Sequence, residues 1–397
     1  MRDNIIVKRK TNIPLVTIAL ASLGGTHNEG TARAGLTAFQ ARVSIKGTRK
    51  RSAPGQIAME AENLGGSVSP SVGSDLFDWE ITVPSKHFDR ALDLLQDVAY
   101  NPSFPEREFE IERKLTLSDL QQTRDDMYRY PLRLCLQQAF KGHAYGSSLA
   151  DVQEVITDVT REVLSAWHDR QTRAEPWAFV VGDVDPDKAS TRIERFLPSK
   201  RNRQGVVASC GWSGPSIQVE QRDKAQTALA LGFPGPDRNN PDAHALQVLA
   251  NAVGGLGGRL FEELRSNRSL AYTVSLLPVA RWLGGAFVAY IATAPAREDE
   301  ARAALLEEID RLRNDLLSSD ELERSKRYTI GTWQIRSQTN AAQLSDLMHA
   351  HMVGPGPSEI TNFEQNINEV SAEHIRTAAQ RYFDPAMMVE GIVRGKA

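Results

Sequence analysis

The chain has 397 residues, of which 41% are apolar and 24% are charged, an ordinary balance for a soluble globular protein. Its formal net charge is -3, so the composition indicates no strong attraction to nucleic acid or to a membrane surface. No apolar run approaches the roughly 18 residues of a membrane helix, and the length predicts two domains of about 200 residues each.

The first predicted elements are a buried strand and an amphipathic helix. Residues 16–22 (VTIALAS) form an apolar run typical of a buried strand. In residues 35–48 (GLTAFQARVSIKGT), Leu36, Phe39 and Val43 recur at helical spacing and predict one apolar helix face.

The other face of this helix carries Ala38, Ala41 and Arg42. Alanine has no donor atom, and arginine is a fixed cation that repels a metal ion. This face therefore predicts neither a metal site nor a reactive group.

The rest of the first half continues with a strand, two helices and a final strand. Residues 78–85 alternate like a strand, and residues 87–100 follow as a helix with an apolar stripe. A second helix begins near Pro105, which suits a first-turn position, and residues 177–185 form an apolar strand.

The second half repeats this order about 210 residues later. The repeated elements are strands at 227–233 and 286–293, helices at 298–312 and 318–328, and a strand at 387–395. Ser319 or Asp320 is expected to cap the second of these helices. Five elements in matching order predict two copies of one unit.

Strands come in neighbouring groups rather than in strict alternation with helices, which predicts an α+β fold. We expect two tandem homologous α/β domains, each a mixed, largely antiparallel sheet packed with helices. The N-terminal domain is expected at 1–200 and the C-terminal domain at 217–397. Residues 201–216, rich in Gly, Ser and basic residues, are expected to link them.

Other motif searches favour structural roles. Cys135 and Cys210 form no CxxC and are expected as buried free thiols, with one disulfide as the alternative. None of the eight histidines lies three or four residues from another, and His349 and His351 point in different directions on a helix. Residues 254–259 (GGLGGR) lack the Lys-Ser/Thr of a phosphate loop and predict a backbone turn.

The helix at 35–48 resembles the zinc-binding helix of the pitrilysin/insulinase family of zinc peptidases, in the subgroup built from half-length subunits. Active members carry HxxEH in a context like G-L-x-H-F-x-E-H-x-x-x-K-G-T. The framing residues match at Gly35, Leu36, Phe39, Lys46, Gly47 and Thr48. The two histidine positions are Ala38 and Arg42, and the catalytic glutamate position is Ala41.

The family's third zinc ligand is a glutamate on a later helix. Here Glu112 and Arg113 match its context, and Asp119 stands at the ligand position. One aspartate cannot build a site that needs three protein ligands and a water. The resemblance therefore implies the family's two-domain fold and no metal or cofactor in this chain.

The second half resembles the family's C-terminal domain in residues 254–275 (GGLGGRLFEELRSNRSLAYTVS). The family uses an arginine and a tyrosine seven residues apart to hold substrate, and these match Arg265 and Tyr272. The alternatives are a surface ion pair of Arg265 with Glu262 or Glu263, and core packing for Tyr272. The spacing inside this long match favours substrate binding.

The resemblance implies the non-catalytic subunit of a heterodimeric zinc metallopeptidase that acts on peptides. Its partner would be a homologous subunit that carries HxxEH and the zinc, and the two expected substrate-binding residues would hold peptide and stabilise the transition state. The alternative is a purely structural subunit, similar to the peptidase-derived core proteins of respiratory complexes. No nucleic-acid or membrane partner is expected. The sequence does not reveal the compartment; the cytoplasm is the default, and the periplasm is the alternative if an export signal has been removed.

Overall fold

The computed structural model describes residues 2–198, 210–255 and 257–396. Their contacts divide them into two compact units. The first unit consists of residues 2–120, 149–198 and 336–357, and the second of residues 121–148, 210–335 without 256, and 358–396.

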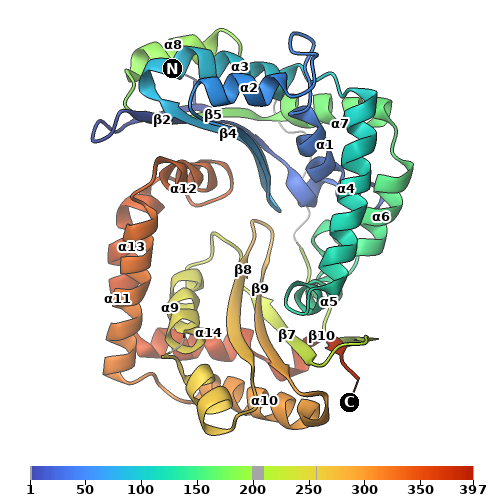
Figure 1. Cartoon of the computed structure of the whole chain (residues 1–397). Coiled ribbons are helices and arrows are strands. Elements are labelled where there is room, and N and C mark those ends of the chain that lie inside the picture. The colour runs from blue at the N-terminus through green and yellow to red at the C-terminus, as the bar shows by residue number, and fades with distance from the viewer. Residues whose placement is uncertain (1, 199–209, 256, 397) are drawn as a thin grey trace. The chain divides into compact units, whose positions relative to one another are not determined.

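Each unit contains one five-stranded sheet, and the two sheets have the same topology (Figure 1). The first sheet has the order β1 (Ile5–Arg9), β5 (Pro176–Gly182), β2 (Leu15–Leu23), β4 (Leu76–Pro84), β3 (Val68–Val72). The second has the order β6 (Ser216–Gln221), β10 (Val389–Arg394), β7 (Thr227–Gly235), β9 (Gly285–Thr293), β8 (Thr273–Ala280). In each sheet the first pairing in this order is parallel and the other three are antiparallel. The predicted α+β fold with two repeated, mixed sheets is confirmed.

Helices surround both sheets. Those of the first unit are α1 (Leu36–Ser44), α2 (Gln56–Asn63), α3 (Phe88–Tyr100), α4 (Glu106–Asp125), α6 (Leu149–Asp158), α7 (Arg161–Ala174), α8 (Pro186–Glu194) and α12 (Asn340–Met352). Those of the second are α5 (Arg129–Ala139), α9 (Asp242–Gly254), α10 (Glu298–Asn314), α11 (Ser319–Arg336), α13 (Ser358–Asn368) and α14 (Ala372–Tyr382). The last residues of α4 are counted with the second unit, and the last residue of α11 with the first. No helix among the described residues is both long enough and apolar enough to cross a membrane.

The first sheet is covered on both faces. Val16, Ile18 and Leu20 of β2 belong to the main core of the unit. Helices α2, α3 and α8 cover this face of the sheet (Figure 1). Helix α12 packs on the opposite face, against β2 and β5. There the rings of Trp177 and Phe179 lie 6.2 and 6.3 Å from the ring of His351, measured between centroids.

The second sheet follows the same plan with α5 in the place of α12. Leu229, Leu231 and Phe233 of β7 point into the core under α9, α10 and α14. Their neighbours on the other face of β7 are small, Ala228, Ala230 and Gly232, and this face receives α5. The alternation of large and small side chains in one buried strand thus assigns each face its own helix layer.

Each half of the sequence contributes one helix to the compact unit formed mainly by the other half. Helix α5 belongs to the first half of the sequence but packs on the second sheet, and α12 belongs to the second half but packs on the first sheet. Each follows the long helix of its own repeat, α4 or α11, so the exchange is reciprocal. A single cut in the sequence therefore does not separate the compact units. The predicted linker, 201–216, falls for the most part on residues outside the described ranges, so the domain limits at 1–200 and 217–397 stay a prediction.

Helix α5 approaches its sheet so closely that Gly391 has no room for a side chain. A Cβ added there would lie 2.3 Å from the backbone nitrogen of Cys135 and 2.4 Å from the carbonyl oxygen of Pro131. We expect Gly391→Ala to lower the free energy of unfolding by about 1–2 kcal/mol, because the helix backbone must move. Urea unfolding of the full chain measures this effect. The matched control is Gly331→Ala on α11, where an added Cβ meets nothing within 4 Å and should not destabilise. Equal losses of unfolding free energy in the two variants would contradict the close approach of α5 to Gly391.

Two local expectations are corrected or refined by the structure. Helix α11 is capped by Ser318, whose Oγ accepts from the backbone N–H of Glu321 at 3.3 Å, while Glu321 Oε2 accepts from the N–H of Ser318 at 3.1 Å. Ser319 and Asp320 were the wrong choice because the reciprocating glutamate lies three residues after Ser318. Cys135 and Cys210 are both free thiols, but only Cys135 is fully buried. Partial burial raises the pKa of Cys210 to about 11.

Candidate functional site

Helix α1, which carries Ala38, Ala41 and Arg42, begins at a buried carboxylate. Glu29 accepts from the backbone N–H groups of Gly35 at 2.7 Å and Thr37 at 2.8 Å. A negative charge at this end stabilises the helix and satisfies N–H groups that lack an intrahelical partner. On the apolar face, the rings of Phe39 and Phe109 meet edge to face with centroids 5.2 Å apart, which packs α1 against α4. The predicted apolar face of α1 is confirmed by the burial of Leu36, Phe39 and Val43.

An ion-pair network joins α1 to α4 at the motif positions. Arg42 donates from Nη1 to Asp119 Oδ2 at 2.6 Å and from Nε to Glu112 Oε2 at 3.1 Å. Lys46 Nζ lies 2.8 Å from the other oxygen of Glu112. The Glu112 side chain is 5% exposed and that of Arg42 is 36% exposed. Two acids and two cations therefore neutralise one another here.

This network does not fit a zinc ion. Ala38 is exposed and Ala41 is buried, and neither supplies a donor atom. Burial alone would lower the pKa of Arg42, but its hydrogen bonds to Asp119 and Glu112 outweigh burial and raise the pKa. The cation is thus held at the position that the family resemblance assigns to the second histidine. Within residues 2–198, 210–255 and 257–396, no group of three or more His, Cys, Asp or Glu could hold a metal ion.

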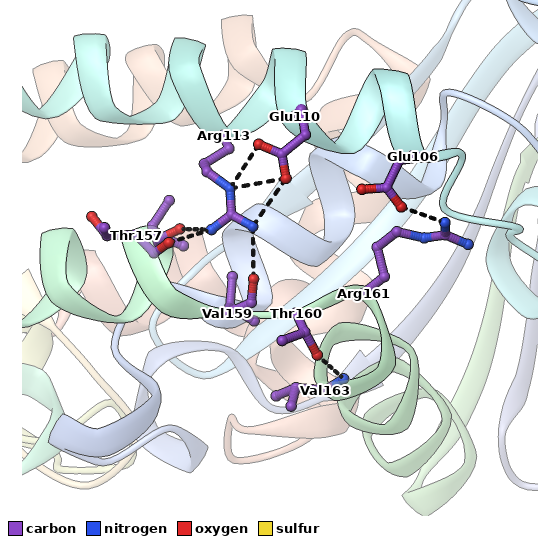
Figure 2. A network of polar contacts seen from close by, with 9 residues as sticks. Glu106, Glu110, Arg113, Thr157, Val159, Thr160, Arg161 and Val163 are labelled. Carbon is purple, nitrogen blue, oxygen red and sulfur yellow. Dashed lines mark hydrogen bonds and ion pairs between the residues drawn. The ribbon is translucent and has the colours of Figure 1, made fainter.

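Helix α4 is fixed in place from its other side by Arg113, as Figure 2 shows. The guanidinium donates to three carbonyl oxygens at and beyond the end of α6, those of Ile156, Thr157 and Val159, at 2.5, 2.6 and 2.7 Å. Glu110 holds the same guanidinium at 3.2 Å. A second ion pair, between Arg161 Nη1 and Glu106 Oε2 at 2.6 Å, ties α4 to the start of α7. Arg113 therefore caps a neighbouring helix and positions the helix that carries Glu112.

His349, His351 and His168 contribute to packing. His349 Nδ1 lies 2.9 Å from the carbonyl oxygen of Ser345, one turn earlier on the same helix. His351 faces the aromatic pair of β5 described above. His168 lies in the core beside Trp79 and Phe104, and burial lowers its pKa to about 3, so it stays neutral.

In the second unit, Arg265 lies on a π-helical segment, Phe261–Asn267. Such segments are rare and occur frequently at functional sites. The guanidinium lies 4.9 Å from the ring centroid of Phe261. Glu263, one of the two expected partners, is instead engaged by Arg268 Nε at 2.9 Å and by Asn267. In the described part of the chain, Arg265 takes part in no ion pair, so its charge is available.

Tyr272 directly precedes β8 and is 55% exposed, so it is not a core residue. Its backbone N–H donates to the carbonyl oxygen of Ala292 at 2.8 Å, which fixes the residue at the end of the sheet. Its hydroxyl makes no hydrogen bond to any described residue. Strand β8 and the π-helical segment contact each other, so the Arg265 and Tyr272 segments are neighbours in one unit.

The fold defines a class of two-unit α+β proteins that includes solved peptidase structures. The peptidase M16 inactive domain from Pseudomonas fluorescens matches with a TM-score of 0.89 and 19% identity, covering 100% of this chain and 97% of that one. A protease from Helicobacter pylori matches with a TM-score of 0.84 and 18% identity, covering 96% and 94%.

Sequence comparison places the chain in a family within that class. Residues 4–153 match the model of insulinase (peptidase family M16), and residues 158–328 match the model of the peptidase M16 inactive domain. The chain belongs to the insulinase family, as its motifs predict. An uncharacterized zinc protease of Mycobacterium leprae is 27% identical over 92% of this chain and 85% of its own length. One from Rickettsia felis is 26% identical over 93% and 90%.

The contacts among the residues of α1 and α4 are not evident from the sequence. The structure brings Arg42 and Asp119 together, with Glu112 and Lys46 completing the network. The signal was present, because Arg42 on α1 and the acids Glu112 and Asp119 on α4 carry opposite charges. Glu29 was missed, and nothing in its local sequence distinguishes it from a surface glutamate.

Proposed function

We propose that this chain is the non-catalytic subunit of a heterodimeric zinc metallopeptidase. The observation that carries the proposal is the ion-pair network of α1 and α4. Arg42 engages both Glu112 and Asp119, and the positions of the remaining motif residues are alanines. Such a site can neither hold the metal nor activate a water, so cleavage must take place on another chain.

The contribution of this chain is substrate binding by Arg265 and Tyr272. A guanidinium and a phenolic hydroxyl are donors that suit a peptide carbonyl oxygen. They also suit the oxyanion that forms when water attacks that carbonyl group. Two observations support this role: Arg265 forms no ion pair with a described residue although Glu263 is close in sequence, and Tyr272 is exposed. The partner supplies the zinc, and this chain orients the peptide.

We expect the purified chain to hold no stoichiometric zinc and to cleave no peptide. The reason is the absence of donors at Ala38 and Ala41 together with the cation at Arg42. Metal analysis after dialysis and a fluorogenic peptide assay measure both properties. The control is the same chain mixed with a homologue that retains HxxEH, which should cleave peptides and lose activity with a chelator. One tightly bound zinc per isolated chain would overturn the proposal.

A purely structural subunit is the second candidate. The ion pairs at Arg42 and the anchoring of Arg113 favour it, because both replace chemistry with stable helix packing. A structural role, however, gives no reason for the guanidinium of Arg265, on a π-helical segment, to form no ion pair with any described residue. The two candidates differ in whether the complex needs Arg265, and the activity of an Arg265→Ala complex distinguishes them.

A further inference from the structure

Three of the four sheet edges are protected against the addition of another strand. The outer strands β3 and β8 each contain a proline, Pro70 and Pro278, which lacks the N–H group that a full ladder needs. The outer strand β1 is packed against α8 and ends in two cations, Lys8 and Arg9. Such features keep an exposed edge from pairing with another chain.

The fourth edge, β6, lacks this protection. It contains no proline, and its single strand neighbour among the described residues is β10. Its side chains alternate in an unusual sense, because the apolar ones face outward: Ile217 is 58% exposed and Val219 is 40% exposed. The polar ones face α5, where Gln218 accepts from Gln138 at 2.6 Å and Glu220 accepts from the Tyr130 hydroxyl at 2.5 Å.

In the first unit, a helix covers the face that corresponds to the Ile217 and Val219 face of β6. Strand β1 occupies the same place in the first sheet, and its residue Ile5 is only 2% exposed. It lies in one cluster with Ile193 of α8, the helix that packs on β1. In the described part of the second unit, no helix covers Ile217 and Val219 in this way. Two adjacent apolar residues on an open edge strand indicate an interaction surface.

We propose that a second copy of this chain adds its own β6 antiparallel to this edge, which joins the two second-unit sheets into one. The strand is self-complementary in one register, with Gln218 of both copies on the two-fold axis. Ile217 then lies opposite Val219 of the other copy, and Val219 opposite Ile217, so apolar side chains form two cross-strand pairs. A shift by two residues leaves at most one such pair.

The charges agree with this register. Glu220 of one copy lies opposite Ser216 of the other, so no like charges meet across the interface. The two Gln218 side chains lie on the α5 face, away from the apolar pairs. The main-chain hydrogen bonds of the added strand would provide affinity, and the two apolar pairs would fix the register. This inference is independent of the proposed peptidase role.

Sedimentation of the full chain over a range of concentrations tests the proposal. We expect a concentration-dependent dimer, weakened at least about tenfold by Val219→Lys or by Ile217→Lys, because a lysine would face an apolar side chain of the other copy. The matched control is Ser69→Lys, which adds the same charge to an exposed position of β3 and should leave the dimer unchanged. A monomer at all concentrations, or a dimer that survives both β6 lysines, overturns the proposal. The proposal is also overturned if the chain is a monomer and requires Val219 to bind the zinc-bearing subunit, because that subunit would then occupy the β6 edge.

Cross-linking tests the register itself. In a background with Cys210→Ser, Gln218→Cys should form an intermolecular disulfide on oxidation, because residue 218 meets its own copy on the axis. Val219→Cys alone should not cross-link efficiently, but it should do so when mixed with Ile217→Cys. Efficient cross-linking of Val219→Cys with itself would contradict the register.

Discussion

Arg265→Ala is expected to lower the kcat of the mixed complex by about 10²–10³-fold, equivalent to about 2.7–4 kcal/mol of transition-state stabilisation. The reason is the loss of a charged donor to the oxyanion, from a residue that no described carboxylate neutralises. Tyr272→Phe removes only a hydroxyl and should also lower kcat. Each variant is reconstituted with the wild-type zinc subunit and assayed by peptide cleavage.

The kinetic parameters distinguish two ways in which these residues could act. If they only hold the substrate, KM should rise while kcat stays nearly unchanged. Arg268→Ala is the matched control for loss of a nearby arginine, since Arg268 is engaged by Glu263 and Glu307. Tyr128→Phe is the control for loss of an exposed hydroxyl. Assembly must be verified by gel filtration before the rates are compared. Wild-type rates in both assembled variants would leave the structural role as the better description.

Glu112→Ala is expected to lower the free energy of unfolding by about 3 kcal/mol, the lower end of the range for breaking a buried ion pair. Its side chain is 5% exposed and holds both Arg42 and Lys46, at 3.1 and 2.8 Å. Without it, two cations remain side by side, and among the described acids only Asp119 still pairs with one of them. The value is set at the low end because both cations are about one-third exposed and therefore partly screened.

Asp119→Ala is the matched comparison for this second prediction. It removes a carboxylate from the same network, but the Asp119 side chain is 52% exposed, so we expect a loss below about 1 kcal/mol. Urea unfolding at low and high salt measures both variants, and the Asp119 effect should decrease more with salt. Equal losses from Glu112→Ala and Asp119→Ala would show that burial does not strengthen the pair.

Much of the fold was accessible from the sequence because both halves repeat the same periodic elements. The apolar runs at 16–22 and 227–233 lie within the central strands β2 and β7, and the alternating run at 78–85 overlaps β4. These strands are buried, so their patterns are strong. Edge strands such as β6 were not predicted, since its exposed apolar and buried polar residues give no standard alternation.

The exchange of helices could not be predicted from local patterns. Helix α5 has the amphipathic pattern of any surface helix, and this pattern does not indicate which of the two sheets it covers. The decisive features are distant small residues, Gly232 on β7 and Gly391 on β10, which leave room for α5. Likewise, the sequence shows that Ala38, Ala41 and Arg42 lie on one face of α1, but not that Arg42 binds Glu112 and Asp119. Pairing of that kind depends on the distance between α1 and α4, which the sequence alone does not contain.

The exchanged helices also constrain synthesis on the ribosome. Strand β5 ends at Gly182 and α12 begins at Asn340. The last strand of the first sheet is therefore synthesised 158 residues before the start of the helix that covers the second face of that sheet. At roughly 5–20 residues per second, this interval lasts about 8–30 s. Throughout it the nascent chain presents Trp177 and Phe179 without their cover, an apolar surface that chaperones bind and that promotes aggregation. The first unit therefore completes its folding only after most of the second has been translated, and a chain interrupted between the repeats would leave both units incomplete.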